Sequence, residues 1–415
     1  MNVYPHLDRR LAPSSTESER YLRIKIQAPD TARPGSRLPL NIALVIDRSG
    51  SMSGSKLEKA KEAAIFTLRN LTGADRAAVV AYDDQVRTVS PSRALSPDVK
   101  NSMIADIRAI YSGGSTNLSG GWLTGAQEVA NHLHEANYLN RAILLSDGLA
   151  NVGITDPAEL ERHADQLRQR GVSTTTMGIG ADFDEHLMER MAVKGGGHFY
   201  FIEDARQIPD ILHREIGEVL STIARQVTLE VTLPEGVHGE LLNSFEVTRT
   251  GRTFQVRLDD MIAGEERTVV FRLSVRPGAL GNSLPITIML RYTDVESGES
   301  RTAASTEAAL RYAGQAEADT EAPDSSVVEE VALLRAAQAR EEALKLDAAG
   351  DYARSATILA SAAQYMRAAA PASAEAMQEA EALDAESQNA AQGLGAMARK
   401  AMHYSRTTRM QSRKK

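Results

Sequence analysis

The stretch NIALVIDRSGSMSG, residues 41–54, decides the fold. Residues 41–46 are almost wholly apolar, as expected for a strand of a parallel sheet that helices cover on both faces. The turn after this strand offers one carboxylate, Asp47, and two hydroxyls, Ser49 and Ser51, two and four residues further on. Because alternate residues of an extended turn can point the same way, these three oxygen-bearing side chains can converge on one point.

Hard oxygen ligands of this kind suit Mg²⁺, Mn²⁺ or Ca²⁺ and not zinc. Ser/Gly-rich turns after a strand are common, however, and the same turn is compatible with a helix N-cap or a phosphate-binding loop. A P-loop is disfavoured because no Gly-Lys-Ser/Thr follows the turn. Taken alone, the turn leaves the metal site, the helix cap and the phosphate loop open.

Short apolar strands alternate with amphipathic helical patterns throughout residues 41–222. This alternation predicts an α/β domain with a doubly wound, mostly parallel sheet flanked by helices. In such a sheet, ligands bind at the carboxyl ends of the strands, near the point where the strand order reverses. We expect the strands at 41–46, 76–82, 141–146, 172–180 and 198–202, with 86–90 as a hairpin partner at the sheet edge.

Two more strand ends supply oxygen ligands. The loop YSGGSTNLSGG, residues 111–121, precedes a helical pattern and offers Thr116, and ILLSDG, residues 143–148, ends an apolar strand with Asp147. Because the strand ends of a doubly wound sheet lie side by side, all three loops can meet at one rim. Five oxygen-bearing side chains from three loops are a more specific signal than any one loop.

The loops DRSGSMSG, GGSTNLSGG and LLSDG resemble the metal-ion-dependent adhesion site of von Willebrand factor A domains, and the resemblance covers residues 41–222. The family's Asp-x-Ser-x-Ser motif is matched by Asp47, Ser49 and Ser51, and its last aspartate by Asp147. The family's threonine follows Gly-Gly and precedes a glycine by five residues. Thr116 has Gly121 at that distance, although Ser115 stands between it and the Gly-Gly pair.

The resemblance implies that Ser49, Ser51 and Thr116 bind Mg²⁺ directly, with Mn²⁺ or Ca²⁺ as alternatives, and that Asp47 and Asp147 act directly or through water. Neutral direct ligands leave the cation electrophilic, so that a carboxylate of a protein partner can complete the octahedron that Mg²⁺ requires. The expected partner is therefore a protein that offers an acidic side chain to the metal.

The segments on either side of the α/β domain have strand-like periodicity. In SERYLRIKIQ, within residues 18–40, Leu22, Ile24 and Ile26 alternate with polar residues and precede a Pro/Gly turn. Residues 223–312 alternate in the same way, which predicts an antiparallel β-sandwich that the early strand joins. The α/β domain would then be inserted into the β-domain. The β-rich segment is similar to the one that follows this domain in bacterial relatives and in inter-alpha-trypsin-inhibitor heavy chains.

The C-terminal third changes composition again. Residues 313–326 are small, acidic and polar, which is typical of a linker. Residues 327–402 are Ala-rich with helical spacing, and we expect an α-helical hairpin or bundle that serves in oligomerisation or docking. Residues 396–415 hold seven Lys/Arg and no acid. We interpret residues 403–415 as a disordered basic tail, the alternative being a docking tail for an acidic surface.

Composition excludes several classes of protein. The 415 residues carry a net charge of −8, which disfavours a general nucleic-acid binder. The absence of cysteine excludes disulfide scaffolds and Cys-ligated metal sites. No apolar run approaches the roughly 20 residues of a membrane helix, and the N-terminal residues do not resemble a signal peptide. We therefore expect a cytoplasmic protein without a membrane span.

The three loops contain no His, Cys or Lys that could serve as a base or nucleophile, which favours a binding protein over an enzyme. His198 has no partner at ligand spacing and is interpreted as structural. The leading hypothesis is a metal-dependent protein–protein interaction or scaffold protein. The alternative is a non-ATPase subunit of a chelatase-like or assembly machine, in which a ring ATPase would be a separate chain because this one has no Walker motif.

Overall fold

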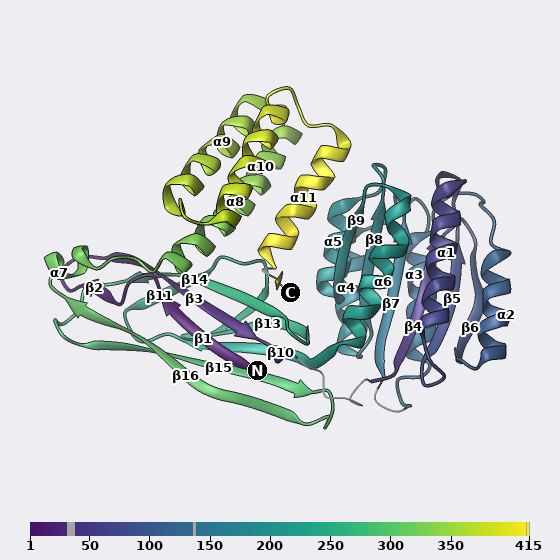
Figure 1. The fold of residues 1–415 in the computed structure, drawn as a ribbon, viewed down its shortest axis with the longest axis horizontal. Helices are drawn as coiled ribbons and strands as arrows, with labels where there is room; N and C mark the ends of the chain where they lie inside the picture. Colours follow the sequence, from purple (N-terminus) through teal and green to yellow (C-terminus); the bar gives the residue numbers. More distant parts are fainter. Residues whose placement is uncertain (31–37, 136–137, 412, 415) are drawn as a thin grey trace. The chain divides into compact units, whose positions relative to one another are not determined.

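The computed structural model describes residues 1–30, 38–135, 138–411 and 413–414. Most of the expected Pro/Gly turn after the first long strand falls in residues 31–37 and lies outside the described residues. The chain forms two compact units, one of residues 38–221 and the other of residues 1–30 together with those from 222 onward (Figure 1).

A six-stranded sheet forms the centre of the first unit, in the order β6-β5-β4-β7-β8-β9 among the described residues. All neighbouring pairs are parallel except β5 with β6, which confirms the expected doubly wound fold. The strand order reverses between β4 and β7, so their carboxyl ends flank the switch point. The strands are β4 (Leu40–Asp47), β5 (Arg76–Tyr82), β6 (Val86–Ala94), β7 (Leu139–Ser146), β8 (Ser173–Ile179) and β9 (Gly196–Ile202).

Helices cover both faces of this sheet. Leu44 and Ile46 of β4 pack in one apolar core with Leu68 of α1 and Leu212 of α6, whereas α3 lies against the other face, beside Val45. Burial on both faces explains why β4 has no polar alternation. The helices are α1 (Ser55–Asn70), α2 (Pro97–Arg108), α3 (Leu118–Ala130), α4 (Pro157–Gln169), α5 (Glu185–Lys194) and α6 (Ile208–Leu220), with short 3-10 turns η1 (Gly50–Met52) and η2 (Ala205–Gln207).

Two packed sheets form the β-rich part of the second unit, in the orders β1-β3-β14-β11, with β17 beside β14, and β12-β13-β10-β15-β16-β2. One apolar cluster contains residues of both sheets, as in a β-sandwich. The strands are β1 (Asn2–Leu7), β2 (Leu11–Pro13), β3 (Ser18–Gln27), β10 (Thr222–Thr232), β11 (Val237–Leu241), β12 (Glu246–Thr250), β13 (Thr253–Ile262), β14 (Glu266–Val275), β15 (Ser283–Asp294), β16 (Ser300–Ala313) and β17 (Arg413–Lys414).

The strand β3 pairs antiparallel with β14 along its whole length, from Ser18 opposite Val275 to Gln27 opposite Glu266. Leu22, Ile24 and Ile26 are fully buried in the sandwich core. The chain therefore leaves the sandwich after β3, builds the α/β unit and returns to the sandwich at β10.

Four helices complete the second unit as a bundle: α8 (Ser325–Ala348), α9 (Tyr352–Ala369), α10 (Ala374–Ala390) and α11 (Ala396–Met410). The buried guanidinium of Arg340 on α8 forms ion pairs with Glu379 and Glu386 of α10. Val327 and Val331 of α8 pack against Val270 of β14, so the bundle and the sandwich share apolar contacts.

Two expectations about the C-terminal third are wrong. Residues 313–326 are not a free linker, because they include the helix α7 (Gln315–Thr320) and because Glu321 accepts hydrogen bonds from the backbone N–H groups of Arg10 and Leu11, at 2.9 and 2.8 Å. The basic tail is helical as far as Met410. Its charge is balanced locally, since Arg406 pairs with Glu341 and Arg409 with Glu375. Residues 412 and 415 lie outside the described residues.

None of the helices within the described residues combines the length and the apolar character that crossing a bilayer requires.

The order of the last helix can be tested at Met410, which is 6% exposed and packs with Leu242, Val270 and Val331. Met410→Ala should lower the free energy of unfolding of the second unit by about 2 kcal/mol, because it leaves a cavity in an apolar cluster. Thr408→Ala, an exposed site in the same turn, should have almost no effect. Equal, near-zero effects in chemical denaturation would show that this segment does not pack.

Candidate metal centre

The three loops expected to form a site lie at the carboxyl ends of neighbouring strands. Asp47 is the last residue of β4, and Asp147 directly follows β7, which pairs with β4. Ser51 lies in η1 and Ser49 directly precedes it, and Thr116 precedes α3. Parallel pairing therefore brings all three loops to one rim of the sheet.

Asp47 is completely buried and organises the first loop. Its Oδ1 accepts a hydrogen bond from the backbone N–H of Ser49 at 2.8 Å, and its Oδ2 accepts one from the Ser146 hydroxyl at 2.7 Å. Burial is the main reason why the pKa of Asp47 is raised, and the nearby charge of Asp147 raises it further, against the hydrogen bonds that lower it. A cation at this rim would relieve that electrostatic cost.

Asp147 is also completely buried and joins the first loop to the end of β7. Its Oδ1 accepts a hydrogen bond from the Ser51 hydroxyl at 2.7 Å, and the Ser49 and Ser51 hydroxyl oxygens lie 3.2 Å apart. The second oxygen of Asp147 lies 2.5 Å from the ammonium of Lys56. The two carboxylates and the two serine hydroxyls therefore form one connected cluster.

Thr116 is held at the same rim by backbone contacts. Its carbonyl accepts hydrogen bonds from the N–H groups of Asn151 and Val152 in the loop after β7, at 3.1 and 3.2 Å. The hydroxyls of Thr116 and Ser51 both lie close to Gly148. A Cβ at that position would be 3.2 Å from Thr116 Oγ1 and 3.8 Å from Ser51 Oγ. The two hydroxyls thus face the same small space, which glycine leaves free.

Asp83, at the end of β5, positions the threonine loop. Its carboxylate accepts hydrogen bonds from Gly114 N–H at 3.1 Å and from Arg48 at 2.9 Å, and its backbone carbonyl accepts one from Asn117 N–H at 2.7 Å. The structure gives Asp83 the role of tying the loop of Thr116 to the loop of Asp47.

The donor set fits a hard divalent cation. Two carboxylates and three hydroxyls, all oxygen donors, border one rim, and none of the five residues contributes the sulfur or imidazole that zinc prefers. The space beside Gly148 is bordered by two of these hydroxyls. Lys56, which forms an ion pair with Asp147, lies on α1 outside the loops, so the sequence pattern did not single it out.

A doubly wound sheet with oxygen donors at its switch point belongs to the class of α/β domains that bind ligands at strand ends. Residues 41–214 match the family model of the von Willebrand factor type A domain. The α/β unit of this chain is a von Willebrand factor A (VWA) domain.

Two bacterial proteins and one bovine protein are similar to half or more of this chain. The uncharacterized protein sll0103 of Synechocystis sp. is 27% identical over 86% of this chain and 85% of its own length. The uncharacterized protein YfbK of Escherichia coli is 31% identical over 53% of this chain, which spans only 38% of YfbK. Inter-alpha-trypsin inhibitor heavy chain H4 of Bos taurus is 28% identical over 52% of this chain and 24% of its own length.

Two solved structures share the fold. The von Willebrand factor type A protein from Catenulispora acidiphila has a TM-score of 0.72 at 19% identity, with 93% of this chain and 96% of the other covered. The ArnB paralog VWA2 from Sulfolobus acidocaldarius has a TM-score of 0.62 at 18% identity, with 99% and 97% covered.

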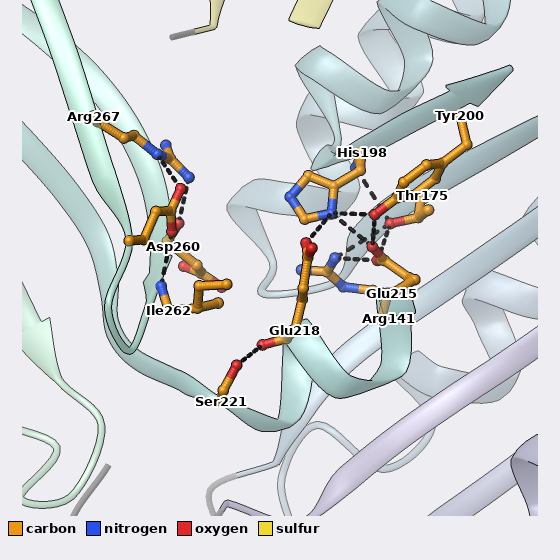
Figure 2. Close-up of polar contacts among 11 residues, drawn as sticks. Arg141, Thr175, His198, Tyr200, Glu215, Glu218, Ser221, Asp260, Ile262 and Arg267 are labelled. Atoms are coloured by element: carbon orange, nitrogen blue, oxygen red, sulfur yellow. Dashed lines mark hydrogen bonds and ion pairs between the residues drawn. The ribbon is translucent and has the colours of Figure 1, made fainter. Parts of the chain in front are cut away.

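A second polar cluster surrounds the buried carboxylate of Glu215 on α6 (Figure 2). Glu215 Oε1 accepts hydrogen bonds from Arg141 Nη1 and Thr175 Oγ1, both at 2.6 Å. Glu215 Oε2 accepts one from the Tyr200 hydroxyl at 2.8 Å and lies 2.6 Å from His198 Nδ1. These partners come from β7, β8 and β9, so the cluster fixes α6 to three strands of the sheet.

His198, Glu215 and Glu218 have ligand atoms within 4.8 Å of one another, a spacing that could hold a metal ion. Both oxygens of Glu215 are already hydrogen-bonded, however, and the guanidinium of Arg141 would repel a cation. Burial alone would raise the pKa of Glu215, but the charges of His198 and Arg141 hold it well below its usual range. We therefore interpret the cluster as a structural anchor of α6.

Glu215→Gln should lower the free energy of unfolding at neutral pH by about 3–5 kcal/mol, because Arg141 would lose its buried counterion. Since the folded state lowers the pKa of Glu215, its contribution is fully present above the ordinary pKa of 4.5 and is lost as the pH falls below it. The difference between wild type and variant should therefore shrink progressively as the pH falls below 4.5. Glu218→Gln is the control, and denaturation at several pH values is the measurement. A pH-independent difference would contradict this account.

Proposed function

We propose that this VWA domain binds a protein partner through a divalent cation, Mg²⁺ in the first instance, held by Asp47, Ser49, Ser51, Thr116 and Asp147. The observation that carries the proposal is the connected cluster of two fully buried carboxylates and two serine hydroxyls, with the Thr116 hydroxyl facing the same space. An acidic side chain of the partner would complete the coordination of the ion.

Each residue of the chain has a distinct part in this proposal. Asp47 positions Ser49 by accepting a hydrogen bond from the backbone N–H of Ser49, and Asp147 positions the Ser51 hydroxyl by accepting its hydrogen bond. The three hydroxyls are neutral donors, so a bound cation would keep most of its charge and supply a Lewis-acidic centre for a carboxylate. The resulting association should depend strictly on divalent cations.

The surroundings of the site support a binding role. VWA domains in general take part in protein–protein interactions and in metal-dependent binding. Apolar side chains flank the site: Leu149 is 50% and Val152 36% exposed in the loop after β7, and Tyr111 is 69% exposed at the start of the threonine loop. Met52 is buried and does not contribute to this rim. We therefore infer a partner segment with apolar residues beside its acid, and we place the chain among binding proteins and not enzymes.

Thr116→Ala should weaken Mg²⁺ binding by about tenfold or more, because it removes one of few direct ligands. The fold should change little, since the loop contributes no large core side chain. Ser115→Ala is a matched control, because Ser115 is the neighbouring hydroxyl and is exposed. Calorimetric titration with Mg²⁺ measures the affinity, and thermal melts in EDTA measure the fold. If Ser115→Ala weakens Mg²⁺ binding and Thr116→Ala does not, the assignment of the threonine is wrong.

The partner is tested by affinity capture from native lysate with Mg²⁺ or with EDTA, using the wild type and both variants. A protein that the wild type and Ser115→Ala retain only with Mg²⁺, and that Thr116→Ala loses, fits the proposal. A partner held equally in EDTA would place the interaction elsewhere, for example on the C-terminal helices. Specific Mg²⁺-dependent retention of a ring ATPase would identify the chain as a subunit of an energy-dependent machine.

A further inference from the structure

The ammonium of Lys56 occupies a position beside Asp147 that a metal ion would contest. Lys56 Nζ lies 2.5 Å from Asp147 Oδ2. The carboxylate of Asp147 is completely buried, whereas the Lys56 side chain is 28% exposed. We propose that Lys56 is a built-in cation that neutralises Asp147 in the metal-free protein and that must leave Asp147 when a divalent ion binds, so that it lowers the affinity of the site for metal. This inference rests on the metal site proposed above.

Lys56 reaches the site because of where its helix begins. The helix α1 starts at Ser55, directly after the loop of Ser49 and Ser51, so Lys56 lies in its first turn. The ammonium also lies beside the end of β8, where a Cβ on Gly180 would be 3.8 Å from Nζ. At that distance a side chain would only touch the lysine, so Gly180 shows how close the ammonium lies to the end of β8.

The charges at the rim explain why a cation is held there. Asp47 accepts hydrogen bonds from the backbone N–H of Ser49 and from the hydroxyl of Ser146, which are both neutral. Asp147 receives a neutral hydroxyl from Ser51 and the positive charge of Lys56. One ammonium therefore accompanies two buried carboxylates, and Coulomb attraction in a poorly solvated site is strong.

A divalent ion would compete with this ammonium for the same carboxylate. The divalent ion and the ammonium of Lys56 would both lie close to Asp147 and would repel each other. The ammonium is the more mobile of the two charges, so it is the one that moves away. The partly exposed lysine stem is flexible enough to carry its ammonium into solvent. The free energy of metal binding is then that of the oxygen donors alone, made less favourable by the free energy needed to separate Lys56 from Asp147.

The decisive variant is Lys56→Met in the full chain, which keeps the stem and removes the charge. In titrations with Mn²⁺ followed by electron paramagnetic resonance, Lys56→Met should bind the ion about tenfold more tightly than the wild type. In EDTA it should melt at a lower temperature, because Asp147 loses its counterion. Lys56→Arg retains the charge and should bind Mn²⁺ less tightly than Lys56→Met.

Lys59→Met is the matched control, since Lys59 lies on the same helix and pairs with the exposed Glu62 at 2.6 Å. It should bind Mn²⁺ as the wild type does. Equal or weaker Mn²⁺ binding by Lys56→Met than by the wild type overturns the inference and leaves the proposed metal site intact. Adding Thr116→Ala to Lys56→Met should abolish the gain, and a persistent gain means that the ion binds elsewhere, which also overturns it. Absence of Mn²⁺ binding in the wild type and in Lys56→Met would instead refute the proposed site itself.

Discussion

Parallel pairing of β4 with β7 is the constraint on which the rim of oxygen donors depends. In the observed register Ile46 lies opposite Leu145, which places Asp47 beside Ser146 and brings the loop of Asp147 next to that of Asp47. The hydrogen bond from Ser146 to Asp47 crosses this pair of strands. A slip of one residue would turn the side chains of either strand to the opposite face and separate the donors. Side-chain hydrogen bonds between the two strands fit this register, from Asn41 to Asn140 near the start of the pair and from Ser146 to Asp47 at its end.

Burial of carboxylates in the VWA domain has an electrostatic cost, which neighbouring groups offset to different degrees. Asp47 and Asp147 are removed from water at the rim, and Glu215 is removed from water where α6 packs against β7, β8 and β9. Glu215 is surrounded by an arginine, a histidine and two hydroxyls and has all the partners that it needs. At the rim the partners are hydroxyls, backbone N–H groups and one partly exposed lysine. A carboxylate site that is incompletely neutralised is suited to binding a cation, whereas a fully neutralised one serves stability.

Much of this organisation could be predicted from the sequence, because it depends on periodicity and on strand ends. The apolar strands, their alternation with helices and the convergence of the three loops all follow from local patterns. Lys56 could not be found in this way, since the reach of a flexible side chain has no sequence spacing. The partners of Glu215 come from three strands and meet only in the folded sheet. The last part of α11, residues 403–410, was interpreted as a disordered tail because its basic residues were counted without the acidic residues on α8 and α10 that pair with them.

The insertion of the VWA domain between β3 and β10 has a consequence for the order in which the chain can fold during synthesis. Ser18 pairs with Val275, so the central pair of one sandwich sheet has a very high sequence separation. The strand β3 leaves the ribosome long before β14 exists, and its alternating apolar face has no partner in the meantime. The VWA domain, by contrast, is built from contiguous chain and can form as soon as its last helix emerges. Once the VWA domain has folded, the two chain segments that join it to β3 and β10 are held by a folded domain. The slow, non-local closure of the sandwich follows.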